Sequence, residues 1–352
     1  MNLAILQAEK NLGNTKENPS VGCVIIKNNC VVSAGYTSKN GRPHAEANAI
    51  YNNKNKISGG DLYVTLEPCT HIGKTGPCVN KIINSKIKRV FFSISDHDVR
   101  TKNNAKIILE RKNIFTNKGL YSSKLNHFYR SYIKSKKLNL PFVTAKLAIS
   151  KDFFSKNKEK KWITNEFSRG RVHLMRSNHD CIVTSAKTVI DDNPKLTCRI
   201  NGLENKTPAR VIIDKNLKIP ENSDILKSAR YYKTIVFYNR EDKRKIRILK
   251  KFGNTLIKMP LTSNNGLDLK DILIKLKKFG FYRIFLEAGP CLTSSFFERK
   301  LIDDFKLFIS KQKLGKKGTK KINKIMNYLK KINPIKERVN LLGDLLISYK
   351  VK

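Results

Sequence analysis

Long hydrophobic runs, a secretory leader and regularly spaced cysteines are all missing from this sequence. No apolar run reaches the roughly 18 residues that a helix needs to span a bilayer. The N-terminal segment lacks the basic region and the uncharged core of a secretory signal. The seven cysteines stand at irregular spacing, which argues against the disulfide framework of a small secreted domain. We therefore expect no membrane span and a reducing, cytoplasmic location.

Acidic residues are scarce: 28 Asp and Glu stand against 71 Lys and Arg, giving a net charge of +43. This excess raises the question of a nucleic-acid partner. The lysines, however, are spread along the whole chain, and no interleaving of aromatic and basic residues marks a stacking platform. We interpret the charge as a solvated basic surface, typical of a genome with biased base composition. It should attract anionic small molecules, and we expect no specific nucleic-acid partner.

The length and the apolar content suit two folded domains. The chain has 352 residues, and 40% of them are hydrophobic. Strands that alternate with helices in both halves predict layered α/β domains. We expect the first domain at residues 1–120, a bridging helix at residues 121–140, ended by Pro141, and the second domain at residues 141–352.

Apolar patterning and turn residues give the positions of the elements. In the first domain we predict helices at 1–12, 44–51, 79–84 and 105–112, and strands at 21–27, 30–33, 62–66 and 89–95. In the second domain we predict strands at 142–148, 181–185, 210–214, 233–238 and 282–287, a helix at 269–278 and a helix from about residue 292.

Two short stretches supply the residues of a catalytic zinc site. His44 precedes Glu46 by two residues, and Cys69 and Cys78 each follow a proline. One imidazole and two thiolates can hold a tetrahedral zinc ion and leave its fourth position open for water. The metal lowers the pKa of that water, and a nearby carboxylate such as Glu46 can pass its proton to a leaving amine. The order H-x-E and then two Pro-Cys pairs is typical of zinc deaminases.

The alternative interpretation is that these residues are small buried cysteines and a surface histidine. We favour that interpretation for an isolated cysteine, but not for this ordered set. Cys78 would open a helix, where the helix dipole favours a thiolate. Nucleic-acid deaminases separate their cysteines by two residues, whereas eight residues separate Cys69 from Cys78. The long spacing therefore narrows the class of zinc deaminase and argues against a nucleic-acid deaminase.

In the second half, the predicted strand at 282–287 runs into Ala288-Gly289-Pro290 and then a helix. The free backbone N–H groups of such a turn can bind a phosphate. The turn has no G-x-G-x-x-G, and many α/β turns contain glycine for steric reasons alone. By itself this anion site is a weak prediction.

Three stretches of the first half are Asn18-Pro-Ser-Val-Gly-Cys23, Pro43-His-Ala-Glu46 and Glu67-Pro-Cys-Thr-His-Ile-Gly-Lys-Thr-Gly-Pro-Cys78. They resemble the deaminase domain of the bifunctional riboflavin-biosynthesis deaminase/reductase family. Six stretches of the second half resemble the reductase domain of the same family, in the same order: 146–150, 162–164, 171–176, 188–194, 196–199 and 287–290. The resemblance covers roughly residues 1–345.

The resemblance implies an N-terminal cytidine-deaminase-like three-layer domain and a C-terminal dihydrofolate-reductase-like α/β domain. The first would use one Zn2+ ion to deaminate 2,5-diamino-6-ribosylamino-4(3H)-pyrimidinone 5′-phosphate. The second would use NADPH to reduce the ribosyl side chain to ribityl. The expected partner is thus a small phosphorylated pyrimidine, and the family leads us to expect a homodimer.

Carried over residue by residue, the resemblance assigns zinc binding to His44, Cys69 and Cys78 and proton transfer to Glu46. It assigns substrate binding to Arg176, Leu196, Arg199 and Glu287. It assigns cofactor binding to Ala148, Trp162, Thr188, Asp192, Gly289, Pro290, Cys291, Leu292, Thr293, Ser294 and Ser295. Arg176 and Arg199 would clamp the substrate phosphate, because a guanidinium fork binds phosphate through two hydrogen bonds.

The sequence departs from the family pattern mostly in the second half. Phe153 stands where the family usually has a glycine, and Lys160 stands where it usually has a serine. One alternative is therefore a deaminase with an impaired reductase domain. A nucleic-acid deaminase is a further alternative. So is an RNA-binding protein with a structural zinc, for which His71 is the obvious fourth ligand.

Overall fold

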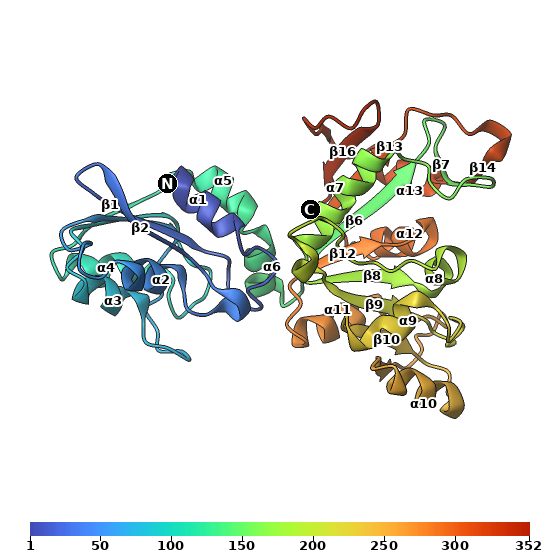
Figure 1. The fold of residues 1–352 in the computed structure, drawn as a ribbon, viewed down its shortest axis with the longest axis horizontal. Helices are drawn as coiled ribbons and strands as arrows, with labels where there is room; N and C mark the ends of the chain where they lie inside the picture. Colours follow the sequence, from blue (N-terminus) through green and yellow to red (C-terminus); the bar gives the residue numbers. More distant parts are fainter. The chain divides into compact units, whose positions relative to one another are not determined.

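Two β-sheets, each with its own helices, divide the chain into two units (Figure 1). The computed structural model describes every residue from Met1 to Lys352, and the units comprise residues 1–140 and residues 141–352. Both units are of the α/β class, as the alternation of strands and helices predicted.

The first unit is built on a five-stranded sheet. Its strands are β1 (Gly22–Lys27), β2 (Cys30–Tyr36), β3 (Asp61–Leu66), β4 (Arg89–Ile94) and β5 (Phe115–Lys118). Its helices are α1 (Asn2–Glu9), α2 (Ala45–Asn52), α3 (Cys78–Asn84), α4 (Asn104–Glu110), α5 (Ser122–Phe128) and α6 (Arg130–Leu138). The strand order is β2-β1-β3-β4-β5. β1 is antiparallel to both β2 and β3, whereas β3, β4 and β5 are parallel.

Two glycines allow helices to pack closely on the two faces of this sheet. A Cβ on Gly22 would lie 1.9 Å from the carbonyl oxygen of Ala4 in α1, and a Cβ on Gly35 would lie 2.4 Å from that of Ala45 in α2. Gly35 pairs with Cys23, and successive strand residues such as Gly22 and Cys23 face opposite sides of the sheet. α1 and α2 therefore cover opposite faces, which gives the predicted three layers.

The helical segment after the sheet belongs to the first unit. In place of one bridging helix over 121–140, the chain forms α5 and α6, which meet at Tyr129. Leu125, Tyr129 and Tyr132 are buried in the core of the first unit. The hydroxyl of Tyr129 lies 2.6 Å from that of Thr65 in β3. These few side chains tie both helices to the sheet, although the segment as a whole is polar.

The second unit is built on a nine-stranded sheet and a separate pair of strands. Its strands are β6 (Phe142–Ile149), β7 (Phe154–Asn157), β8 (Cys181–Ser185), β9 (Ala209–Ile213), β10 (Thr234–Tyr238), β11 (Thr255–Lys258), β12 (Arg283–Glu287), β13 (Asp304–Ile309), β14 (Gly318–Lys321), β15 (Pro334–Lys336) and β16 (Leu345–Lys350). Its helices are α7 (Glu166–Ser177), α8 (Ala186–Asp192), α9 (Asp224–Lys227), α10 (Lys243–Lys251), α11 (Leu269–Lys278), α12 (Pro290–Glu298) and α13 (Asn323–Leu329).

The order of the large sheet is β11-β10-β9-β8-β12-β6-β13-β16-β15, and β14 pairs with β7. The strands from β11 to β13 are parallel, and β16 and β15 extend the sheet in antiparallel fashion. β12 returns to the centre, between β8 and β6. In open α/β sheets ligands bind beyond the carboxyl ends of such strands. Ser185 ends β8 and Glu287 ends β12, so the topology places the candidate site there.

The central strands of the second unit are buried because helices cover the sheet. Every residue of β10 is buried, as are Ile284, Phe285 and Leu286 in β12. Such strands read as nearly continuous apolar runs, which is why the sequence located them well. None of the helices in either unit combines the length and the apolar character that crossing a membrane requires.

A buried histidine makes the stability of the second unit depend on pH. His179 donates from Nδ1 to the carbonyl oxygen of Met175 (2.6 Å), and its Nε2 is buried without a partner. Burial lowers the pKa of His179 to about 3, whereas an unfolded histidine titrates near 6.5. Between these values the unfolded chain binds a proton that the folded unit does not. The contribution of His179 to the free energy of unfolding is therefore highest above about pH 6.5 and falls as the pH is lowered.

We predict that His179 contributes a loss of roughly 1 kcal/mol of stability per pH unit between about pH 6 and pH 4, and that His179→Phe changes the slope by that amount. Asp180, with a pKa raised by desolvation to about 7, contributes with the opposite sign in both proteins. Denaturant titrations followed by fluorescence of Trp162, the only tryptophan, measure the second unit specifically. His127→Gln changes an exposed histidine of the first unit and should keep the wild-type slope. Equal slopes for the wild-type protein and the His179 variant would contradict the prediction.

Candidate active sites

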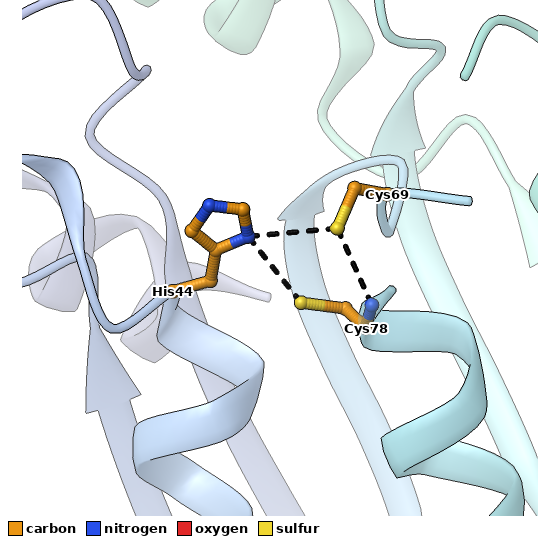
Figure 2. A group of neighbouring side chains, drawn as sticks. All are labelled: His44, Cys69 and Cys78. Carbon is orange, nitrogen blue, oxygen red and sulfur yellow. Dashed lines mark hydrogen bonds between the residues drawn. The ribbon is translucent and has the colours of Figure 1, made fainter. Parts of the chain in front are cut away.

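The three predicted zinc ligands come from three different elements of the first unit. His44 is the N-cap of α2, Cys69 follows the end of β3, and Cys78 is the first residue of α3. His44 Nδ1 lies 3.5 Å from Cys69 Sγ and 3.4 Å from Cys78 Sγ. Figure 2 shows the imidazole turned toward both sulfurs. The fold thus brings together side chains that the sequence separates by up to 34 residues.

This donor set fits a zinc ion. Zinc lies about 2.3 Å from a thiolate and about 2.0 Å from an imidazole nitrogen, so tetrahedral angles place nitrogen and sulfur about 3.5 Å apart. The two observed separations, 3.5 and 3.4 Å, agree with that value. The Cys78 backbone N–H also donates to Cys69 Sγ over 3.3 Å. Hydrogen bonding to Cys78 holds the pKa of Cys69 well below that of an ordinary thiol, which favours the thiolate that binds metal.

Glu46 lies beside this donor set without belonging to it. It is the second residue of α2, is only 4% exposed, and lines a pocket of about 280 Å³ together with His44 and Cys69. Burial raises the pKa of Glu46 to about 7, and the charge of His44 opposes the shift. A carboxyl group with a pKa near neutrality is suited to taking up a proton and releasing it again.

His71 does not provide a fourth zinc ligand. Its Nδ1 lies 2.9 Å from the hydroxyl of Thr101, and the group that could hold a metal contains only His44, Cys69 and Cys78. Three protein ligands leave one position open, which is the arrangement of catalytic zinc sites and not of structural ones. A structural zinc with His71 as its fourth ligand is therefore not supported.

The buried carboxylate of Glu67 connects the zinc-ligand segment to the loop at 95–105. Glu67 is 2% exposed and accepts hydrogen bonds from the backbone N–H groups of Asp96, Asn103 and Ala105, over 3.0, 3.0 and 3.1 Å. This loop lines the pocket through Asp96, Asp98 and Arg100. Sequence analysis missed Glu67 as a positioning residue, because its partners are backbone groups that leave no side-chain pattern.

A buried ion pair organises the candidate site of the second unit. Arg176 in α7 is 8% exposed, and its Nε and Nη2 donate to the two oxygens of Glu287 at the end of β12 over 2.9 and 2.8 Å. Its Nη1 donates to the carbonyl oxygen of Thr197 (2.8 Å). Lys146 Nζ lies 3.9 Å from Glu287. Burial alone would raise the pKa of Glu287, but the charge of Arg176 lowers it to about 2.

Arg176 was predicted as one arm of a phosphate clamp, a role that stays a prediction; within the protein it binds Glu287 and Thr197. All three of its guanidinium nitrogens already have partners within the protein. Arg199 is exposed instead, and its guanidinium has a single contact, 3.4 Å from Nη1 to the hydroxyl of Thr197. Arg199 is the less engaged of the two, because Arg176 keeps at most two N–H donors beyond its bonds to Glu287 and Thr197. Leu196, by contrast, is a buried residue, 3% exposed.

The turn after β12 offers donors for the predicted cofactor. Gly289 is the N-cap of α12, no side chain caps this helix, and Pro290 occupies its first turn. The first backbone N–H groups of α12, at Cys291 and Leu292, thus lack intrahelical partners. No protein atom lies within 4 Å of the position that a Cβ on Gly289 would take, so a ligand can approach the backbone closely. These features fit a cofactor phosphate at the helix N-terminus.

The other predicted cofactor residues lie on neighbouring elements. Thr188 in α8 accepts a hydrogen bond from the backbone N–H of Gly289 (3.3 Å), which links the two helices. Asp192 ends α8, and Ala148 is a half-buried residue of β6. Trp162 is 54% exposed, with Arg169 lying 5.2 Å from its ring centroid. Of the remaining predicted residues, Thr293 and Ser294 are buried within α12, and the Ser295 hydroxyl donates to the carbonyl oxygen of Cys291 (3.2 Å).

One departure from the family pattern, Phe153, and one predicted substrate residue, Leu196, lie on strained backbone. Phe153 has a φ of 69° and Leu196 a φ of 50°, in the left-handed region that side chains rarely adopt. Phe153 is 42% exposed, so its ring is not held in place by a core. Non-glycine residues in this conformation cluster at functional sites, where the surrounding structure maintains the strain.

Comparison with known proteins identifies both units. Residues 1–94 match the cytidine and deoxycytidylate deaminase zinc-binding region, and residues 141–334 match the RibD C-terminal domain. The chain is 34% identical to riboflavin biosynthesis protein RibD of Aquifex aeolicus, over 99% of this chain and 97% of that one. It is 34% identical to RibD of Actinobacillus pleuropneumoniae, over 91% of this chain and 85% of that one.

Solved structures agree with this assignment. A deaminase/reductase from Thermotoga maritima superposes with a TM-score of 0.83 at 27% identity, covering 99% of this chain and 97% of that chain. RibD from Acinetobacter baumannii gives the same TM-score at 26% identity, with the same coverage.

Fold and site together define a zinc-dependent deaminase domain joined to a reductase domain. The chain belongs to the RibD family. It is therefore a bifunctional deaminase and reductase of riboflavin biosynthesis that uses zinc and NADPH, as the sequence predicted.

We predict that Cys78→Ser abolishes zinc binding and ammonia release, because two ligands hold zinc far more weakly than three. Atomic absorption on the purified protein should fall from about one zinc ion per chain to nearly none. Cys30→Ser, at an exposed cysteine of β2, is the matched control and should keep its zinc. A Cys78 variant that retains stoichiometric zinc would rule out this ligand assignment.

We predict that Arg176→Met costs the second unit about 3 kcal/mol of stability, because Glu287 is then buried without its main partner. Reduction should be lost as well, while ammonia release continues. Denaturant titration and the two activity assays test this. Arg230→Met, at an exposed arginine of the same unit, should change neither. Unaltered reduction by the Arg176 variant would show that the ion pair does not organise this site.

Proposed function

We propose that the first unit deaminates 2,5-diamino-6-ribosylamino-4(3H)-pyrimidinone 5′-phosphate and that the second reduces the ribosyl side chain of the product to ribityl. The observation that carries the first step is the trio of His44, Cys69 and Cys78, two of which, His44 and Cys69, line one pocket with the buried Glu46. The similar Thermotoga maritima protein is a diaminohydroxyphosphoribosylaminopyrimidine deaminase and 5-amino-6-(5-phosphoribosylamino)uracil reductase, which supports this choice of substrate.

In the deaminase site, zinc bound by the three ligands would supply Lewis-acid activation of water. Glu46 would then do the proton transfer. Its buried carboxylate would take a proton from the attacking water and deliver it to the amino group that leaves as ammonia. The backbone contacts of Glu67 keep the pocket loop in place while this happens.

In the reductase site, NADPH would supply the hydride, and the protein would supply binding and orientation. The first N–H groups of α12 would bind a cofactor phosphate. Glu287, held ionised by Arg176, would accept hydrogen bonds from the substrate. Arg199, with its exposed donors, would bind the substrate phosphate.

Two further properties complete the proposal. All seven cysteines are free thiols, which supports a reducing cytoplasm. The homodimer expected for the family is tested by light scattering of the purified protein across a dilution series.

A coupled assay tests both reactions in one tube, by following ammonia release and NADPH oxidation from the diaminopyrimidine substrate. We expect both signals for the wild-type protein. We expect Glu46→Gln to lose ammonia release by about 100-fold or more, since a general acid–base contributes 10²–10⁴-fold. The Glu46 variant should still oxidise NADPH when the deaminated intermediate is supplied.

Ammonia without NADPH oxidation in the wild-type protein would mean that Phe153 and Lys160 impair the reductase. Absence of both signals from zinc-loaded protein would contradict the proposed function.

A further inference from the structure

The deaminase pocket contains a second group of charged residues that the proton transfer does not use. Asp98, Arg100 and Lys136 line the same pocket as His44 and Glu46. Arg100 lies in the loop after β4, whereas Lys136 lies in α6. The three side chains, which we call the Asp98 cluster, meet at one carboxylate.

Asp98 is the centre of this cluster. It is 7% exposed, and its Oδ1 accepts from Arg100 Nε (2.9 Å) and from the backbone N–H of Arg100 (3.1 Å). Its Oδ2 accepts from Arg100 Nη2 (2.7 Å) and from Lys136 Nζ (2.8 Å). The hydrogen bonds from Arg100 hold the pKa of Asp98 well below its usual range. Both carboxylate oxygens are thus fully occupied by cationic and backbone donors.

The cluster carries an excess of one positive charge and has free donors. Arg100 uses Nε and Nη2 for Asp98, and its Nη1 makes no hydrogen bond within the protein. The Arg100 side chain is 57% exposed and that of Lys136 is 32% exposed. An anion in the pocket can therefore bind both cations without breaking their contacts to Asp98.

The surroundings hold both cations in fixed positions. The backbone carbonyl oxygen of Arg100 accepts from the Thr70 hydroxyl (3.1 Å), one residue after Cys69. Lys136 Nζ lies 5.5 Å from the ring centroid of Tyr132, whose hydroxyl donates to Asp96 (2.6 Å). Less conformational entropy is lost when a ligand meets preorganised donors.

We propose that Arg100 and Lys136 bind the 5′-phosphate of the deaminase substrate, with Asp98 as the residue that positions them. The proposal rests on the proposed function, because the phosphate is part of that substrate. A phosphate monoester matches a guanidinium and an ammonium group held side by side. The proposal explains why a carboxylate bound by two cations lies in a pocket for an anionic substrate.

Six other charged residues line the pocket: Glu17, Arg42, Glu46, Glu67, Lys74 and Asp96. The acids would repel a phosphate, so only the two cations offer alternatives. Arg42 donates from Nη1 to the hydroxyl of Thr75 (2.6 Å) and has no carboxylate partner to hold it in place. Lys74 lies in an exposed loop and forms no ion pair, so nothing fixes its position. The Asp98 cluster is the better built of the candidates, and Lys74 is included in the test.

The test compares ammonia release from the phosphorylated substrate and from its dephosphorylated counterpart, with zinc-loaded full-length protein. For Arg100→Met and Lys136→Met we expect the ratio of the two kcat/KM values to fall about tenfold each, mainly through a higher KM for the phosphorylated compound. This loss corresponds to about 1.4 kcal/mol, in the range of a hydrogen bond to a charged group. Asp98→Asn should lower the ratio as well, because it releases both cations.

A matched control and a direct binding measurement separate this role from a structural one. Arg89→Met removes an arginine that pairs with Asp61 in the same way but does not line the pocket, and it should keep the wild-type ratio. Calorimetry with the deaminated phosphorylated product, in the absence of NADPH and in an Arg199→Met background that weakens its binding to the second unit, should show about tenfold weaker binding when Arg100→Met is added. Zinc content and melting temperature should match the wild-type values.

The outcomes are distinguishable. An unchanged ratio in Arg100→Met and Lys136→Met, with a reduced ratio in Lys74→Met, would overturn the proposal and place the phosphate at Lys74. A wild-type protein that deaminates both compounds equally well would overturn it too, and would leave the deaminase assignment intact. A wild-type protein that deaminates neither compound would overturn the proposed function and this inference together.

Discussion

The deaminase pocket depends on one buried carboxylate. Glu67 stands two residues before Cys69 and accepts three backbone N–H groups from the loop at 95–105. Each buried N–H group left without that acceptor would cost about 1–3 kcal/mol, so the loop has no comparable alternative position. The interaction therefore fixes the position of Arg100 relative to the zinc ligand Cys69. Glu67 thus positions both the zinc-binding side and the cationic side of the pocket.

In the second unit, an ion pair stabilises the buried carboxylate of the candidate site. Glu287 ends a central strand, where a buried carboxylate would otherwise be protonated or destabilising. The bidentate contact with Arg176 keeps it ionised and fixes its orientation. The same contact engages most of the Arg176 guanidinium, whereas that of Arg199 is exposed. A sequence motif names both arginines as candidates, but not which of them touches the substrate.

Local patterns explain what the sequence predicted well. The buried strands and the zinc trio follow from short stretches, since apolar runs define strands and His44, Cys69 and Cys78 carry their chemistry in their side chains. The break between α5 and α6 at Tyr129 was missed, because it depends on burial against a distant strand. The Asp98 cluster was missed for the same reason, because Lys136 lies 38 residues from Asp98 in the sequence and meets it only after folding.

The scarcity of acidic residues gives the sites a common electrostatic character. With 71 basic and 28 acidic residues, three acids with largely buried side chains each pair with more than one cation. Asp98 has two, Glu287 has two, and Asp191 at the end of α8 has three: Lys156, Lys187 and Lys320. Each group keeps a net positive charge although its acid is neutralised. The spread of lysines therefore does have a local consequence, because each such group remains attractive to anions, and the Asp98 cluster does so inside a pocket.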